Sequence, residues 1–421
     1  MKKHKLLSPA QHGFLVGRGC LSNLLETIDC ITFALAHGHN VDVILLDFAK
    51  AFDKVSHRKL LHKLRAYGVG GKLLDWISDF LTMRKQRVVL GEHASDWSDV
   101  KSGVPQGSVL GPILFILFIN DMPEDLVSKL KLYADDSKLI SVHDRPNSTI
   151  LTQLELARLV DWADVWLMEL NLDKCKVLHF GKKNARVEYI MTNNEVSHVL
   201  EASVCERDLG VQLTDNMKWH AQCASAAAKA NRVLGMLGRT FVCRDIKVWE
   251  LLYRSMVRPH LEFAASVWNP TDAGDIDVLE RVQHRATRMV KSIRQLSYEQ
   301  RCKLFGLTSL RLRRARGDMI QMRKLVLHPD ELDLSVPLQP HHALQATGPA
   351  ASTRGHQLRL ASEPLFTASR SDGAARRAEF FVCRSVPLWN KLPASVVLAP
   401  TVSAFKAALD EFLLNKPDFG A

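Results

Sequence analysis

The chain has 421 residues, of which 47% are hydrophobic and 24% are charged, a composition typical of a globular protein rather than a disordered one. Its net charge of +11 is unevenly spread, because residues 1–180 carry 22 Lys/Arg against 21 Asp/Glu and the remainder carries 34 against 24. This distribution favours a carboxylate-bearing first part followed by a surface that binds a polyanion.

The spacing of the cysteines and the hydropathy of the chain exclude further classes of protein. The eight cysteines form no CxxC pair, which argues against a zinc ribbon and indicates reduced thiols in an intracellular protein. The first residues lack the apolar stretch of a signal peptide, and the longest apolar run, residues 113–119, is too short to span a bilayer. We therefore expect no membrane partner.

The spacing of apolar residues predicts mixed helices and strands in the first 100 residues. In chain order these are a helix over residues 21–37, a buried strand over 41–46 followed by Asp47, amphipathic helices over 57–67 and 72–82, and strands over 87–90 and 97–100 that pair around Gly91.

Two turns stand out in the middle of the chain. The loop Gly103-Val104-Pro105-Gln106-Gly107 precedes a buried helix that ends near Asn120, and two strands over residues 129–133 and 138–142 flank Ala134-Asp135-Asp136-Ser137. The remaining expected elements are a helix over 150–169, strands over 177–180 and 209–213, helices across 220–327, a linker over 329–354 and a helix over 402–414.

Three carboxylates have unusual surroundings. Asp47 ends a buried strand, and Asp135 and Asp136 occupy the turn of an apolar hairpin. Carboxylates beside buried strands are costly unless they are neutralised, and Mg²⁺ prefers such oxygen ligands. Two ions a few ångström apart can activate a hydroxyl and stabilise a leaving pyrophosphate. The alternative for an isolated Asp-Asp pair is an ordinary solvated turn.

An ordered set of motifs surrounds these carboxylates. The segments are Leu46-Asp47-Phe48-Ala49-Lys50-Ala51-Phe52-Asp53, Ser102-Gly103-Val104-Pro105-Gln106-Gly107-Ser108, Tyr133-Ala134-Asp135-Asp136, Asn171-Leu172-Asp173-Lys174-Cys175 and Asp208-Leu209-Gly210-Val211. They resemble, in order, motifs A to D and the primer grip of reverse transcriptases. The set is similar to the reverse transcriptases of non-LTR retrotransposons of the jockey and chicken-repeat kind, and further resemblance extends to Trp389-Asn390-Lys391-Leu392-Pro393.

The resemblance implies an α+β fold, the right hand of polymerases. It divides the chain into partial fingers over residues 1–40, a palm with motifs A to E over 41–215, a helical thumb over 216–328, a linker over 329–354 and a C-terminal segment over 355–421. The implied reaction is template-directed DNA synthesis from RNA, with an RNA template, a DNA primer and deoxynucleoside triphosphates as partners.

The resemblance also assigns roles around the carboxylates. Asp47, Asp135, Asp136 and the carbonyl of Phe48 would hold two Mg²⁺ ions, with Mn²⁺ as an alternative ion. Lys174 would protonate the leaving pyrophosphate, although a solvated lysine is the alternative reading.

Further residues are implied to contact the incoming nucleotide. Phe52 stands where the family places its sugar gate, with plain core packing as the alternative. Gln106 and Gly107 would lie against the nucleotide, with an ordinary turn as the alternative. Family members carry arginine where this chain has Leu15, and Arg18 is a nearby substitute. Asp53 is expected to cap the helix that follows it.

Basic residues of the expected thumb indicate a phosphate-binding surface. Arg281, Arg285 and Arg288 follow i, i+4, i+7 spacing and would form one helix stripe. The charge continues with Arg313, Arg314 and Arg316. Such residues would bind template and primer without reading sequence, whereas the alternative is a solvated helix face.

Two competing interpretations remain. The chain could be a catalytically inactive, truncated relic that at most binds nucleic acid, which Leu15 and the absence of the family's upstream finger strands favour. A group II intron maturase is the other, against which Arg313-Arg314-Ala315-Arg316-Gly317-Asp318 argues. No endonuclease motif is visible, so nicking of the target is expected from a missing upstream segment or from elsewhere. The resemblance implies an intracellular location, in the nucleus or alternatively the cytoplasm.

Overall fold

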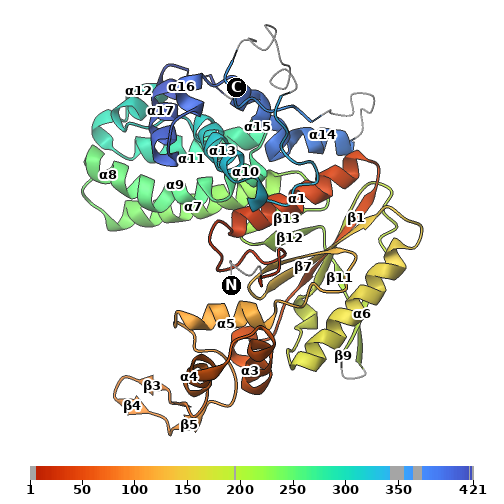
Figure 1. Ribbon diagram of the computed structural model, residues 1–421. Coiled ribbons are helices and arrows are strands. Elements are labelled where there is room, and N and C mark those ends of the chain that lie inside the picture. Colours follow the sequence, from red (N-terminus) through yellow and green to blue (C-terminus); the bar gives the residue numbers. More distant parts are fainter. Residues whose placement is uncertain (1–5, 194–195, 342–354, 364–371, 417, 420–421) are drawn as a thin grey trace. The chain divides into compact units, whose positions relative to one another are not determined.

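The computed structural model describes residues 6–193, 196–341, 355–363, 372–416 and 418–419 (Figure 1). The chain forms two compact units, residues 1–23 with 39–204 and residues 24–38 with 205–421. Helix α1 (Cys20–Ala36), which confirms the first predicted helix, begins in the first unit and continues in the second. The predicted linker extends beyond His341, so its residues 342–354 lie outside the described part of the chain.

A five-stranded sheet of order β11-β8-β1-β7-β6 forms the centre of the first unit. Strand β1 pairs antiparallel with both β7 and β8, β6 pairs antiparallel with β7, and β11 pairs parallel with β8. The strands are β1 (Asn40–Leu46), β6 (Lys129–Tyr133), β7 (Asp136–His143), β8 (Lys176–Phe180) and β11 (Glu201–Ala202). The four predicted strands of this sheet are thereby confirmed to within two residues.

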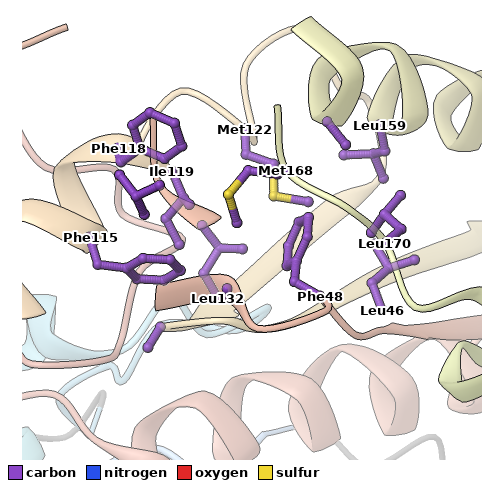
Figure 2. Close-up of a cluster of buried hydrophobic side chains, with 14 of the residues drawn as sticks. Leu46, Phe48, Phe115, Phe118, Ile119, Met122, Leu132, Leu159, Met168 and Leu170 are labelled. Carbon is purple, nitrogen blue, oxygen red and sulfur yellow. The ribbon is translucent and has the colours of Figure 1, made fainter. Parts of the chain in front are cut away.

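Helices pack on the sheet through a continuous apolar core. These helices are α2 (Ala51–Lys54), α3 (His57–Ala66), α4 (Gly71–Leu81), α5 (Leu110–Phe118) and α6 (Ser148–Trp166). Because side chains alternate along a strand, Ile44 and Leu46 of β1 face this core together. Figure 2 shows Phe48, Met122 and Met168 inside the core, with Phe115 of α5 and Leu159 of α6 nearby.

The hairpin after α4 differs from its prediction. Strands β2 (Lys85–Gln86) and β5 (Ser98–Asp99) pair, and β3 (Val89–Leu90) pairs with β4 (His93–Ala94) inside them. The expected pairing of residues 87–90 with 97–100 is therefore wrong. The two-residue turn Gly91-Glu92 sets the inner register, because turn length dictates which residues face each other. A further hairpin, β9 (Ile190–Asn193) with β10 (Val196–Val199), was not predicted.

The second unit is mostly helical, as expected for residues 220–327. It opens with the hairpin β12 (Cys205–Asp208) and β13 (Val211–Thr214), whose turn is Leu209-Gly210, so the strand predicted over 209–213 begins two residues later. Its main helices are α7 (His220–Thr240), α8 (Ile246–Leu252), α9 (Arg258–Glu262), α10 (Ala265–Trp268), α11 (Ala273–Arg288), α12 (Tyr298–Leu304), α13 (Leu310–Leu327), α14 (Asp372–Glu379), α15 (Phe381–Asn390), α16 (Ala394–Val397) and α17 (Val402–Leu414). The last confirms the predicted C-terminal helix.

Side-chain caps define where several of these helices begin. Asp272 accepts hydrogen bonds from the backbone N–H groups of Gly274 and Asp275 at the start of α11, at 2.9 and 3.3 Å. Ser297 and Gln300 form a reciprocal capping box on α12. Such caps satisfy N–H groups that have no partner inside the helix. Within the described residues, no helix is both long and apolar enough to cross a bilayer.

A buried lysine lies among aromatic rings in the first unit. The Lys63 ammonium of α3 lies 3.5 Å from the Trp166 ring centroid and 5.0 Å from those of Phe118 and Trp162, and it pairs with Asp121 at 2.5 Å. Burial lowers the pKa of Lys63 from 10.5 to about 8, although the Asp121 carboxylate opposes the shift. The folded protein therefore binds this proton less tightly than the unfolded chain does.

This lowered pKa predicts a rise of stability with pH. Between about pH 8 and pH 10.5 the unfolded chain keeps the Lys63 proton that the folded protein has released, so Lys63 should add roughly 3 kcal/mol to the free energy of unfolding across that window. Urea denaturation of the wild type and of Lys63→Met at several pH values measures the contribution. A wild type and a variant with parallel pH profiles would show that Lys63 titrates normally.

Candidate active site

The pairing of β1 with β7 brings the three predicted carboxylates to one end of the sheet. Leu46 pairs with Ser137, so the chain leaves β1 at Asp47 beside the turn that carries Asp135 and Asp136. Residues that face each other across antiparallel strands have Cα atoms about 5 Å apart. Tyr133 pairs with Asp136, which leaves Ala134 and Asp135 as a two-residue turn.

The electrostatics of this sheet end favour a cation. Burial raises the pKa of Asp135, and the nearby charge of Asp47 raises it further. Carboxylates that repel each other in this way are the oxygen donors that divalent cations bind. Among the residues that the structure describes, however, no group of three His, Cys, Asp or Glu side chains is arranged to hold an ion. The metal-ligand assignment of Asp47, Asp135, Asp136 and the Phe48 carbonyl therefore stays a prediction.

A segment after α6 lies along the chain that follows β1. Asn171 donates its backbone N–H to the Asp47 carbonyl, and Ala49 donates to the Glu169 carbonyl, both at 2.8 Å. This pairing places the Lys174 ammonium 3.4 Å from the Asp47 carboxylate. The Lys174 side chain is 67% exposed, so it can reach a bound ligand from this position or remain solvated.

The Pro-Gln-Gly loop is attached to the segment that follows Asp47. Backbone N–H groups of Gly103 and Val104 donate to the carbonyls of Val55 and Phe52, at 2.8 and 2.9 Å. The Gln106 amide donates to the Asp53 carboxylate at 2.8 Å. Asp53 was expected to cap the helix that follows it, and this prediction is wrong. Ser56 holds the cap position of α3, and Asp53 lies inside α2.

The two aromatic residues after Asp47 are both packed. Phe48 is buried and meets Trp162 edge-on, with ring centroids 6.5 Å apart. Phe52 is half-buried and stacks on Phe115, with centroids 4.2 Å apart and planes inclined by 17°. One face of Phe52 thus belongs to the core, and its partial exposure leaves the sugar-gate prediction open.

Comparison with known proteins identifies the family. The family model described as reverse transcriptase (RNA-dependent DNA polymerase) matches residues 1–226, more than half of the chain. The chain belongs to the reverse transcriptase family. It is 23% identical over 357 residues to the RNA-directed DNA polymerase from mobile element jockey of Drosophila melanogaster, covering 78% of this chain and 37% of the relative. It is also 28% identical over 151 residues to the Pol polyprotein of the type-1 retrotransposable element R2 of Popillia japonica, covering 36% and 22%.

The chain spans about a third of the length of its jockey relatives, 37% of the Drosophila melanogaster protein and 31% of the Drosophila funebris one. A solved structure of Candida albicans telomerase, in complex with a TWJ fragment of telomeric RNA, aligns with 65% of this chain and 52% of its own. Its TM-score is 0.37 at 10% identity, a similarity too weak to carry an argument.

Arg18, the arginine predicted to bind the nucleotide, lies against the backbone of its own loop. The Arg18 guanidinium donates to the carbonyls of Pro9 and Gln11, the latter at 3.1 Å. In this position Arg18 stabilises the loop that carries Leu15.

The predicted basic residues of the second unit fall into two groups. Arg281, Arg285 and Arg288 are all exposed along α11, as the stripe requires. Arg314 is buried at 2% exposure, so phosphate contact by its side chain is not supported. Arg313 and Arg316 each form two hydrogen bonds with a carboxylate, Glu262 and Asp410 respectively. Basic charge in this part of the sequence therefore serves partly to hold the fold together.

Several residues that position the site were missed from the sequence. His57 and Arg84 both hydrogen-bond the Gly103 carbonyl, at 2.8 and 3.0 Å. Gln11 accepts a hydrogen bond from Ala134 in the turn that precedes Asp135. Each partner is between 19 and 123 residues away along the chain, and no local pattern signals such contacts.

The attachment of the Pro-Gln-Gly loop yields a stability prediction. Gly103 has φ of +89°, and a Cβ there would lie 2.7 Å from the Asp53 carbonyl oxygen, whereas Gly107 has φ of +81° with nothing within 4 Å. Gly107→Ala should cost about 1–2 kcal/mol of backbone strain. Gly103→Ala should cost roughly 1–3 kcal/mol more, because the backbone must move. Urea denaturation measures the free energy of unfolding of both variants. Equal losses of this free energy would contradict the close contact of the loop with α2.

Proposed function

We propose that this chain catalyses template-directed DNA synthesis on an RNA template, as part of a non-LTR retrotransposon. The primer 3′-hydroxyl oxygen attacks the α-phosphorus of a deoxynucleoside triphosphate, a P–O bond to the primer forms, the bond to the β-phosphate oxygen breaks, and pyrophosphate leaves. The observation that carries this proposal is the register of β1 with β7, which brings Asp47 beside Asp135 and Asp136. Family membership supports the same reaction.

The donor chemistry at this sheet end fits a divalent metal. Asp47, Asp135, Asp136 and the Phe48 carbonyl offer only oxygen atoms, which Mg²⁺ prefers and Mn²⁺ accepts. When bound, two such ions would lower the pKa of the attacking hydroxyl and stabilise the charge on the leaving pyrophosphate. The chain's own contribution is to hold the carboxylates on a rigid sheet.

Residues around the carboxylates would select and orient the nucleotide. The exposed face of Phe52 would exclude a ribose 2′-hydroxyl, because its other face is fixed against Phe115. Gln106 and Gly107 would lie along the nucleotide, and Arg18 would contact its phosphates after leaving the loop carbonyls. Lys174, beside Asp47, would give a proton to the departing pyrophosphate.

The exposed stripe on α11 would hold the template and primer by their phosphates. Lys229 and Arg232 of the neighbouring helix α7 extend it, and Arg285 hydrogen-bonds Asn231 of that helix at 3.4 Å. Burial lowers the pKa of Lys229, and the nearby charges of Arg207 and Arg232 lower it further. We further propose that the reaction takes place inside the cell, in the nucleus or alternatively the cytoplasm, and that another polypeptide segment nicks the target.

Primer extension tests the reaction directly. With an RNA template, a DNA primer, deoxynucleotides and Mg²⁺, the wild type should extend the primer, and Asp135→Asn and Asp136→Asn should each slow extension at least about a hundredfold. Asp144→Asn is the matched control, because Asp144 is an exposed acid just beyond the opposite end of β7. A well-folded wild type that binds template–primer without extending it would favour the inactive relic instead.

The thumb assignment predicts a change in salt dependence. Replacing Arg281, Arg285 and Arg288 by alanine should weaken duplex binding equally for all sequences and reduce the slope of log K against log salt by about 0.9 for each phosphate that the variant no longer neutralises. Binding is measured by fluorescence anisotropy from low to moderate salt. A control variant removes three exposed lysines from the C-terminal segment, Lys391, Lys406 and Lys416. If both variants change the slope alike, the stripe has no special role.

A further inference from the structure

The turn that carries Asp135 has a strained backbone. Ala134 is its first residue and has φ of +53°, in the left-handed region. Two-residue hairpin turns of this kind normally have glycine, asparagine or aspartate at such a position. An alanine there is strained, because its Cβ crowds the backbone in the left-handed region. A hairpin that must present Asp135 and Asp136 in one orientation therefore needs support from outside its own two strands.

That support comes from a segment more than 100 residues earlier in the chain. Residues 10–12 lie along β6: the His12 N–H donates to the Leu132 carbonyl at 2.8 Å, and the Leu132 N–H donates to the Ala10 carbonyl at 2.9 Å. The Gln11 side chain is only 1% exposed. Its Oε1 accepts hydrogen bonds from the backbone N–H groups of Gly13 at 2.6 Å and Ala134 at 3.1 Å.

The fit between this segment and the turn is close. A Cβ at Gly13 would lie 2.5 Å from the Ala134 nitrogen, which is closer than side chains approach a backbone. The Gln11 oxygen thus occupies a site that Gly13 and Ala134 share, and a longer or shifted side chain would separate them.

We propose that Gln11 is a positioning residue of the polymerase site: its amide oxygen fixes the strained Ala134 peptide and thereby sets the direction of Asp135 and Asp136. The effect of Gln11 on the reaction rate rests on the proposed function, whereas its support of the Ala134 turn does not. Gln11 acts through the turn and does not touch the nucleotide. Loss of its oxygen should therefore lower the rate of the chemical step and leave nucleotide affinity nearly unchanged.

The opposite end of β6 supplies a matched control. Glu155 of α6 is fully buried, and its Oε1 accepts hydrogen bonds from the backbone N–H groups of Val127 at 2.6 Å and Ser128 at 2.9 Å. Glu155 therefore binds two backbone N–H groups, as Gln11 does, at the start of the strand rather than at the carboxylate turn. If Gln11 only stabilised the fold, its loss and the loss of Glu155 would affect the reaction rate to a similar degree.

The experiment compares Gln11→Met with Glu155→Met, because methionine keeps the length of both side chains and removes the acceptor. Hydrogen exchange of the Ala134 amide should be about tenfold faster or more in Gln11→Met and unchanged in Glu155→Met. In single-turnover primer extension, Gln11→Met should lower the maximal rate about 10- to 100-fold with the nucleotide concentration at half-maximal rate little changed. Glu155→Met should stay within about threefold of the wild type, at a comparable loss of melting temperature.

Each outcome decides the proposal. Equal rate losses in the two variants, or an Ala134 amide that exchanges at the wild-type rate in Gln11→Met, would overturn it. If Gln11→Met does not fold, Gly13→Ala keeps the oxygen but displaces the segment from Ala134, and the same exchange and rate changes are expected. If the folded wild type fails to extend primers, the proposed function is wrong, while the exchange comparison still shows whether Gln11 holds the turn.

Discussion

The antiparallel register of β1 with β7 is the constraint on which the candidate active site depends, because a slip of one residue would turn every side chain to the other face. A buried carboxylate holds this register. Burial alone would raise the pKa of Asp42, but hydrogen bonds from His143, His179, Tyr189 and Asn184 outweigh it and keep that pKa well below its usual range. A shift of β1 against β7 would separate Asp42 from His143, and a shift against β8 would separate it from His179, at a cost of several kcal/mol. The network thus fixes where β1 ends and where Asp47 lies, five residues along.

Local patterns in the sequence were sufficient for the elements that surround this register. Short segments rich in apolar residues and bounded by turn residues predicted β1, β6 and β7. The carboxylates were recognised because they end or separate such segments and because an ordered set of motifs surrounds them. The positions of the carboxylates at one sheet end thus follow from the sequence, whereas the side-chain anchors around them do not. His57, Arg84 and Gln11 reach backbone groups that only folding brings near, so nothing in their own neighbourhood reveals the contact.

The two errors in the prediction have different physical origins, and only the second resembles these omissions. The hairpin after α4 was paired by apolar content, whereas its register follows from the two residues of its turn. Asp53 was expected to cap the helix beside it, because helix caps are local and frequent. In the structure its carboxylate instead accepts a hydrogen bond from Gln106, which is 53 residues away along the chain. For Asp53, a nearby explanation was preferred to a contact between distant segments. Positions with unusual backbone angles, such as Ala134, mark where distant contacts must compensate.

The charge of the second unit shows why net charge overstates the surface available to nucleic acid. Arg377 is buried between Asp29 and Glu363, and Arg384 pairs with the buried Asp318. Removing a partner from such pairs leaves an uncompensated buried charge, so these arginines are retained by the fold whether or not the chain binds phosphate. Arg281, Arg285 and Arg288 of α11 are exposed instead, so their side chains can reach a ligand. The exposed arginines of the second unit, and not these buried pairs, therefore count toward a surface that attracts a polyanion.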